Sequence, residues 1–315
     1  MRVAFFSTHS YDKEYFERFN QKHEIIFYEA PLNIHTVNLA TACNAVCVFV
    51  NDQLNAAVIK SLAALNIKII VLRCAGFNNV DLTAAAENNL IVVRVPAYSP
   101  HAVAEHALAL IMTLNRKTHK AYNRVREGNF ALDRLTGFDL YGKTVGVIGT
   151  GKIGQCFAKI MTGLGCTVLA FDIIANKEME AAGVQYLSLM EVLEQSDIVS
   201  LHCPLTEQTK HLINQHTLSC IKDGCMLINT SRGALIDTKA AIDALKKGKL
   251  GYLGIDVYEQ EEKLFFNDLS ENIIDDDVIM RLLSFPNVFI NYRTSGIFNR
   301  GGLISNSSNF PPKLK

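Results

Sequence analysis

Short apolar segments alternate with amphipathic segments along most of the chain. Within residues 1–96, five apolar runs rich in β-branched residues occur: RVAFF, HEIIFYE, AVCVFV, KIIVLR and LIVVRV. The segments between them, such as 11–19 and 55–65, have the periodicity of helices. Strands that alternate with helical crossovers form parallel sheets, so this pattern predicts a compact parallel α/β unit.

A proline-containing linker, VPAYSP at 95–100, precedes a second region of the same kind. Apolar side chains recur at helical spacing after it, which predicts one long helix from about residue 101 to 127. Together with two strands around residues 144–171, the apolar runs that follow predict a doubly wound sheet of about six parallel strands. These runs are 184–187, 198–202, 226–231, 252–257 and 287–291.

A glycine-rich turn between an apolar strand and a helical segment carries the clearest chemical signal. The strand breaks into GTGKIG at residues 149–154, where helical periodicity begins. In such a turn Gly149 permits the sharp reversal, Gly151 lets the backbone approach a pyrophosphate, and Gly154 allows close packing of helix and strand. The helix N-terminus then offers free N–H groups to an anion.

Asp172 follows the next apolar run, about 20 residues past the glycines. An acid at this place is expected to accept both ribose hydroxyls of an adenosine and to repel a 2′-phosphate, which favours NAD over NADP. A glycine turn alone can be purely structural. The strand before it, the helix after it and the distance to Asp172 together favour nucleotide binding.

Composition excludes several function classes. The chain has 315 residues, 49% of them hydrophobic, with 31 Lys and Arg against 31 Asp and Glu. A balanced charge does not suggest a nucleic-acid or anionic-membrane partner, so an anionic substrate must meet a local cation. The length suggests about two domains. No apolar run has membrane-spanning length and the N-terminus lacks a signal-peptide layout, so we expect a cytoplasmic protein.

The cysteines and histidines do not predict a metal site. The eight cysteines form no C-x-x-C pair and fall mostly in apolar segments, so we expect buried free thiols. The nine histidines lack the spacing of metal ligands.

Several strand ends carry residues that could bind ligands, because ligands of open α/β sheets bind outside the carboxyl ends of strands. Backbone N–H groups around Ala75 and Gly76 could hold a small carboxylate or form only a turn. At 202–204, His-Cys-Pro lies beside the expected cofactor site or marks a proline stop. Arg232 either pairs with an acid or grips a substrate carboxylate with two hydrogen bonds.

An acidic cluster follows the predicted strand at 252–257. Most clusters of this kind form solvated loops, and we expect Glu259 and Glu262 to do so.

Six motifs in order and spacing make the chain resemble the D-2-hydroxyacid dehydrogenase family, specifically its D-lactate dehydrogenase branch. They are VPAYSPHAVAEHALAL, GTGKIG, SLHCPLTEQTKHLI, INTSRGALIDT, GIDVYEQE and LLSFPNV. The resemblance covers about residues 1–290. It implies two doubly wound parallel-sheet domains: a flavodoxin-like substrate-binding domain at 1–99 and a Rossmann NAD-binding domain at 100–295.

The resemblance also implies roles for individual residues. Arg232 would bind the substrate carboxylate and polarise the carbonyl, while Glu261 would orient a catalytic histidine and raise its pKa. Backbone at Ala75 and Gly76 would contact the carboxylate, and Tyr98 matches an active-site tyrosine. Beyond the three glycines, the matched cofactor contacts are Lys152 and Ile153 through backbone, Asp172, Cys203, Pro204, Thr230, Ser231 and Asp256.

The implied reaction is hydride transfer from NADH to the C2 carbonyl of pyruvate, with a proton from a histidinium held against Glu261. After the last strand the family reads approximately Ile-Thr-Gly-His-Gln-Ala-Phe-Phe, whereas this chain has NYRTSGIFNRGG after Ile290 and no histidine beyond His216. The resemblance therefore implies an impaired homo-oligomeric dehydrogenase. An NAD-binding pseudoenzyme or regulatory module is the alternative; a methyltransferase would leave Arg232 and Glu261 unexplained.

The C-terminal sequence suggests a frameshift near codon 290. A codon string for His-Gln-Ala-Phe-Leu-Thr-Glu-Glu-Ala-Leu, read two bases later, encodes Ser-Gly-Ile-Phe-Asn-Arg-Gly-Gly-Leu, which is residues 295–303. Residues 296–315 are then an aberrant remnant of the segment that returns to the first domain in the family. Resequencing the gene tests this hypothesis.

Overall fold

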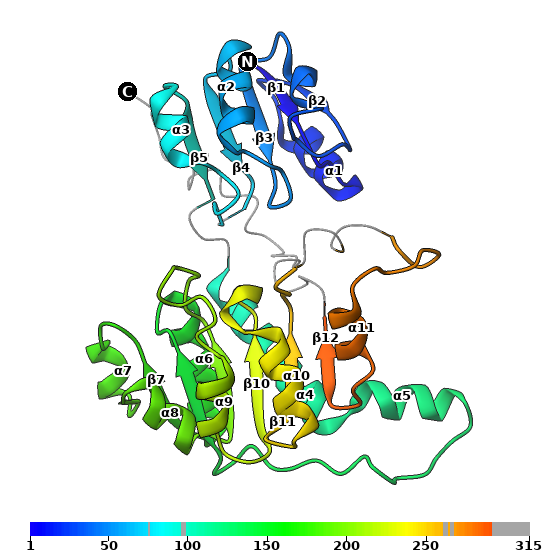
Figure 1. Ribbon diagram of the computed structural model, residues 1–315, viewed down its shortest axis with the longest axis vertical. Helices are drawn as coiled ribbons and strands as arrows, with labels where there is room; N and C mark the ends of the chain where they lie inside the picture. The colour runs from blue at the N-terminus through cyan, green and yellow to red at the C-terminus, as the bar shows by residue number, and fades with distance from the viewer. Residues whose placement is uncertain (75, 96–98, 261–263, 265–267, 292–315) are drawn as a thin grey trace. The chain divides into compact units, whose positions relative to one another are not determined.

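The structure is a computed structural model that describes residues 1–74, 76–95, 99–260, 264 and 268–291. The chain divides into two compact units, Met1–Tyr98 and Ser99–Lys315. Each unit has its own parallel sheet with helices packed against it (Figure 1). The expected remnant at 296–315 lies outside the described residues, as does Glu262. Among the described residues, no helix is long and apolar enough to cross a bilayer.

The first unit has a five-stranded sheet in the order β2-β1-β3-β4-β5, with every pairing parallel. This is the flavodoxin-like order, and it confirms the predicted fold. Its strands are β1 (Arg2–Phe5), β2 (Glu24–Phe27), β3 (Ala45–Val48), β4 (Ile69–Leu72) and β5 (Ile91–Arg94). Its helices are α1 (Ser10–Phe19), η1 (Val37–Ala40), α2 (Ala56–Ala64) and α3 (Leu82–Glu87).

The second unit has a seven-stranded sheet in the order β12-β11-β10-β9-β6-β7-β8, again with parallel pairings. From β8 to β11 this is the doubly wound order of a Rossmann fold, and β12 extends it by one strand. The strands are β6 (Thr144–Ile148), β7 (Thr167–Phe171), β8 (Gln185–Tyr186), β9 (Ile198–Leu201), β10 (Cys225–Asn229), β11 (Leu250–Ile255) and β12 (Val288–Ile290).

Helices cover both faces of this second sheet and bury a separate apolar cluster on each. On one face α4 packs against α6, and on the other α9 packs against α8 and α10. The helices are α4 (Pro100–Arg116), α5 (Thr118–Arg126), α6 (Lys152–Gly163), α7 (Lys177–Ala181), α8 (Leu189–Gln195), α9 (Gln215–Cys220), η2 (Gly233–Leu235), α10 (Thr238–Lys246) and α11 (Asp277–Leu283).

The predicted single helix from 101 to 127 is wrong, because it is two helices that meet at Lys117. Lys117 has φ of 50° and its N–H donates to Thr113 O, which is a left-handed C-cap of α4. Its Nζ also donates to the carbonyls of Arg134 and Thr136, at 3.1 and 2.8 Å. These bonds stabilise the break, and α5 then runs in a new direction with no buried residue.

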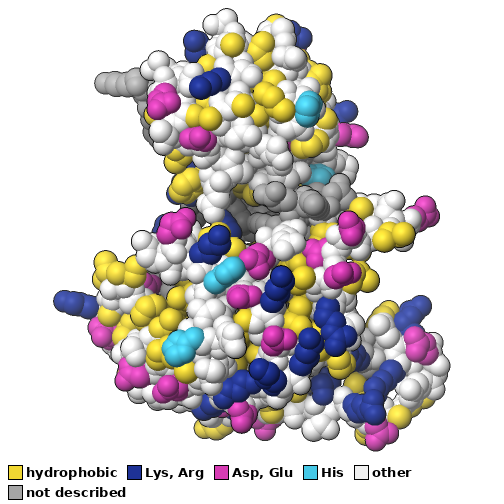
Figure 2. All heavy atoms as spheres, viewed as in Figure 1, with side chains coloured by type: hydrophobic (Ala, Val, Ile, Leu, Met, Phe, Trp, Pro, Cys, Tyr) yellow, Lys and Arg dark blue, Asp and Glu magenta, His cyan; other side chains and the backbone are white. Residues whose placement is uncertain are grey.

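Charged side chains of both signs are interspersed on the visible face of each unit, with Lys and Arg gathered at the bottom of Figure 2. All eight cysteines are free thiols, and six are buried. The expectation of free, mostly buried thiols is therefore confirmed.

Candidate active site

The turn after β6 requires glycine at two positions for different reasons. Gly149 has φ of 93°, and a Cβ there would lie 2.6 Å from the backbone N of Cys203. Gly154 has ordinary helical backbone, but its added Cβ would lie 2.0 Å from Gly149 O. The backbones of the turn, the start of α6 and the segment after β9 are thus packed so closely that no side chain fits between them.

Gly151 faces open space instead. An added Cβ would meet no atom within 4 Å, and Gly151 caps α6 without any side-chain hydrogen bond. In the first turn of this helix the Lys152 and Ile153 N–H groups have no hydrogen-bond partner among the described residues. Free N–H groups at a helix N-terminus with clear space before them fit a pyrophosphate.

Three hydrogen bonds hold the Asp172 carboxylate at the end of β7. Oδ2 accepts from the backbone N–H of Thr150 at 2.5 Å and from its hydroxyl at 3.0 Å. Oδ1 accepts from the Ile173 N–H at 2.7 Å. A carboxylate has about four acceptor positions, so one remains on Oδ1. Asp172 therefore offers a ribose chiefly one oxygen, fewer than the sequence suggests.

His202, Cys203 and Pro204 continue from the end of β9. The His202 ring lies against Phe157, with 4.9 Å between centroids, and its Nε2 is 2.9 Å from Ser200 Oγ. Although part of the residue is exposed, its Nδ1 is buried and has no partner among the described residues. Burial lowers the pKa of His202 to about 3, so this imidazole is neutral near pH 7.

The segment after β10 presents Arg232 through a turn that Asn229 braces. The fully buried Asn229 side chain accepts from the Ser231 N–H at 3.0 Å and donates to Arg232 O at 2.8 Å. Ser231 Oγ donates to Cys203 O at 2.7 Å, which ties this turn to the one after β9. Thr230 Oγ1 is buried and without a hydrogen-bond partner among the described residues, so it is free to meet a ligand.

The Arg232 guanidinium donates to the neighbouring Ser231 O at 2.8 Å. Within the described part of the chain, no carboxylate lies within ion-pair distance of it. Its side chain is therefore available to an external carboxylate at the carboxyl edge of the sheet.

Asp256 directly follows β11 and is 1% exposed. His106 of α4 places its Nε2 3.3 Å from Asp256 Oδ1, and the Asp256 N–H donates to Asn229 O at 3.0 Å. The ends of β10 and β11 are thus joined through the backbone, and the Asp256 side chain connects the end of β11 to α4.

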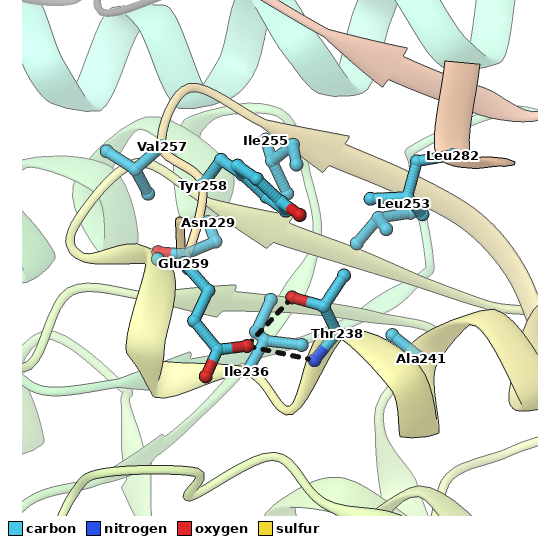
Figure 3. A pocket seen from close by; sticks show the side chains of 11 residues that line it. Asn229, Ile236, Thr238, Ala241, Leu253, Ile255, Val257, Tyr258, Glu259 and Leu282 are labelled. Atoms are coloured by element: carbon cyan, nitrogen blue, oxygen red, sulfur yellow. Dashed lines mark hydrogen bonds between the residues drawn. The ribbon is translucent and has the colours of Figure 1, made fainter. Parts of the chain in front are cut away.

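Glu259 is not a solvated loop residue, contrary to the expectation from its acidic neighbours. Its Oε1 lies 2.6 Å from His211 Nε2, while its Oε2 accepts from the Thr238 hydroxyl at 3.1 Å and from the Thr238 N–H at 3.5 Å. Figure 3 shows the Glu259 side chain pointing toward the start of α10, beside a small cavity whose lining includes Tyr258 and Leu282. These contacts fix the segment that leads toward Glu261.

In the first unit, the end of β4 is held by a buried cation. Arg73 donates to the carbonyls of Phe6 and Ser7 and lies 3.4 Å from Asp12 Oδ2. Gly76, three residues further on, is partly buried, and its carbonyl accepts from the Cys74 thiol at 3.3 Å. The loop that would present N–H groups to a carboxylate therefore begins at a rigid support.

Three of the predicted site residues, Ala75, Tyr98 and Glu261, lie outside the described residues. The structure gathers the others at the carboxyl edge of the second sheet, around the ends of β6, β7, β9, β10 and β11, except for Gly76 in the first unit. In addition it adds three residues that the sequence did not single out: Thr150, Asn229 and His106. All three stand inside motifs of the family resemblance, so position was a usable signal, although helical periodicity alone does not distinguish His106 from its neighbours.

Comparisons with known proteins agree with this geometry. The family model "D-isomer specific 2-hydroxyacid dehydrogenase, NAD binding domain" matches residues 108–291. The 2-hydroxyacid dehydrogenase A of Aspergillus oryzae is 54% identical over 295 residues, covering 92% of this chain and 85% of its own length. The D-lactate dehydrogenase of Escherichia coli is 51% identical over 290 residues, covering 91% of this chain and 88% of its own.

Among solved structures, one described as the pyruvate reductase of Chlamydomonas reinhardtii matches with a TM-score of 0.88 at 46% identity. The match covers 95% of this chain and 90% of that one.

Proposed function

Because the chain belongs to the D-isomer specific 2-hydroxyacid dehydrogenases, an NAD-dependent family, we propose that its reaction is the reduction of pyruvate to D-lactate. The names of its D-lactate dehydrogenase and pyruvate reductase relatives support this substrate. We assign substrate binding to residues 1–99 and cofactor binding to residues 100–295. The observation that carries the proposal is the position of Arg232: its guanidinium has no carboxylate partner among the described residues and lies at the same edge of the sheet as the glycine turn.

The residues around the turn fit the cofactor. The open space at Gly151 suits a dinucleotide, as do the N–H groups of Lys152 and Ile153 and the Thr230 hydroxyl, for which the described part of the chain offers no partner. When bound, NADH supplies the hydride. Asp172 accepts from the adenosine ribose, and Cys203, Pro204, Ser231 and Asp256 surround the remainder of the site.

Arg232 binds the carboxylate of the 2-oxo acid and polarises its carbonyl. A guanidinium forms two parallel hydrogen bonds to a carboxylate, which fixes the substrate in one orientation. From the family resemblance we also assign carboxylate binding to the backbone of Ala75 and Gly76, and a role in substrate binding to Tyr98.

Protonation of the alkoxide is the step for which this chain lacks a suitable acid. In the family pattern a histidine held by Glu261 protonates the developing alkoxide, but this chain has no histidine after His216. His202 is neutral near pH 7 because burial lowers its pKa to about 3, and His211 is bonded to Glu259. Arg293, which falls near the expected histidine position in the sequence, stays protonated at neutral pH and is a poor general acid. We therefore propose an impaired enzyme; an NAD-binding pseudoenzyme or regulatory module without turnover is the alternative.

NADH oxidation with pyruvate, measured on this chain and on a version with the reading frame restored, tests the proposal. Loss of general acid catalysis costs about 10²- to 10⁴-fold, so this chain should be at least about a hundredfold slower. Equal turnover numbers would contradict the impairment. NADH binding by this chain without any pyruvate turnover would favour the pseudoenzyme.

A matched variant of the restored version tests Arg232. Arg232→Lys keeps the charge but loses the two-pronged geometry, so the KM for pyruvate should rise with little change in the NADH dissociation constant. An unchanged KM would refute carboxylate binding by Arg232.

We further propose that the chain forms a homo-oligomer in the cytoplasm. Helix α5 has no buried residue, and α5 and the loop after it expose Tyr122, Val125, Phe130 and Leu132 by 62, 53, 74 and 81%. Apolar side chains gathered in this way favour contact with a second copy. Eight free thiols support a reducing compartment.

A further inference from the structure

We infer that Tyr186 and Thr150 form a hydroxyl relay that fixes the Asp172 carboxylate and thereby sets a preference for NADH over NADPH. The inference rests on the proposed role of Asp172 as the ribose acceptor. It adds two positioning residues to that role, and Tyr186 acts from an edge strand without needing to touch the cofactor.

The strand register brings the relay together. Strand β8 pairs with β7 so that Tyr186 lies opposite Ala170. Side chains alternate along a strand, so Asp172, two residues after Ala170, continues on the face to which Tyr186 points. The Tyr186 Oη is 2.9 Å from Thr150 Oγ1, which in turn is 3.0 Å from Asp172 Oδ2. The edge of the sheet thus helps to place a side chain of the glycine turn.

The direction of these hydrogen bonds is fixed by counting hydrogens. A carboxylate can only accept, so the Thr150 hydroxyl must donate its single hydrogen to Asp172. Toward Tyr186 that hydroxyl can then only accept, and Tyr186 must donate. Hydrogen bonds in series polarise one another, so the tyrosine strengthens the bond that reaches the carboxylate.

Thr150 is itself held tightly. It is 4% exposed, its N–H donates to Asp172 at 2.5 Å, and its carbonyl accepts from Gln155 Nε2 at 2.9 Å. Its hydroxyl therefore has little freedom to leave Asp172, and the carboxylate plane is fixed with Oδ1 left for a ribose hydroxyl.

A fixed carboxylate discriminates better than a free one. It accepts a 2′-hydroxyl without a further entropy cost of ordering the side chain. It also cannot rotate away from a 2′-phosphate, so the repulsion between the two negative charges is not relieved. Loosening the relay should weaken NADH binding while relieving part of the repulsion toward NADPH. The dissociation constant for NADPH divided by that for NADH should then fall.

Fluorescence titration measures both dissociation constants through the emission of the reduced nicotinamide, in a chain without tryptophan. Thr150→Val should weaken NADH binding about tenfold, and Tyr186→Phe about 2- to 5-fold, each with a lower NADPH-to-NADH ratio. Thr150→Ser keeps the hydroxyl and should restore the wild-type ratio. Tyr141→Phe, at a tyrosine that is 80% exposed, is the matched control and should change neither constant.

The outcomes separate the relay from its premise. If Asp172→Ala lowers the ratio but Tyr186→Phe and Thr150→Val do not, the relay is wrong and the role of Asp172 stands. If Asp172→Ala leaves both constants unchanged, the proposed role itself fails. Equal weakening of both cofactors in the relay variants, with a lower melting temperature, would reveal a merely structural contact and overturn the inference.

Discussion

A single histidine shows how burial decides what a residue can do. His202 stands in a motif next to the proposed cofactor contacts, yet its enclosed ring has a pKa lowered to about 3 and cannot donate a proton at neutral pH. Arg232 is the opposite case, since its charge finds no acid among the described residues and stays available. The same edge of the sheet therefore holds one imidazole that stays neutral and one guanidinium that is available to a ligand.

Because burial lowers the pKa of His202, we expect the stability of the protein to depend on pH. Unfolded His202 has an ordinary pKa near 6.5, so between about pH 6.5 and 3 the unfolded chain takes up a proton that the folded chain does not. The contribution of His202 to the free energy of unfolding is therefore fully present above about pH 6.5 and is lost progressively as the pH falls. Between pH 7 and 5 the loss should be about 2 kcal/mol.

Urea unfolding at pH 7 and pH 5 measures this loss. His202→Gln should remove the part of the pH dependence that His202 contributes, whatever it does to stability at pH 7. The exposed His216 provides the control, since His216→Gln should leave the pH dependence as in wild type. Identical pH dependence in all three proteins would contradict the burial argument.

At the scale of elements, helix α6 contains two glycines that differ in what surrounds them. A Cβ at Gly154 would lie 2.0 Å from Gly149 O, whereas one at Gly163 would meet no atom within 4 Å. Gly154→Ala should therefore push α6 off the turn, cost about 1–3 kcal/mol of unfolding free energy and weaken NADH binding. Gly163→Ala should stabilise the protein by about 0.4–1 kcal/mol.

Thermal unfolding and NADH titration of both variants check this pair. Equal effects at Gly154 and Gly163 would mean that helix propensity, and not the close backbone approach, governs this helix.

Elements were predictable from sequence where local pattern decides them. Both parallel sheets follow from the spacing of apolar runs, and the glycine turn with Asp172 follows from a short motif. The break at Lys117 could not be predicted in this way. Apolar periodicity continues through it, and the carbonyls that stabilise it come from residues 134 and 136. Glu259 was misjudged because its partners lie at positions 211 and 238, and a local acidic pattern contains no trace of them.

At the scale of the whole molecule, α5 and the loop after it form an exposed apolar surface that we assign to a second copy of the chain. Phe130→Glu with Leu132→Glu would place charges at the proposed contact and should shift the protein toward monomer. Light scattering coupled to size exclusion measures the mass of the assembly. Ile273→Glu, at a side chain that is 96% exposed elsewhere, is the control and should leave the mass unchanged. A monomeric wild type would refute the homo-oligomer.

The first unit is one uninterrupted stretch of chain, and its buried cluster runs from Ala4 to Leu90 and includes no described residue of the second unit. Proteins are synthesised from the N-terminus, and domains generally fold as units during that process. Once residue 98 has left the ribosome, all the described strands and core side chains of the first unit are outside it. It can thus fold while the glycine turn is still being translated, and a reading-frame error near codon 290 comes too late to disturb that step.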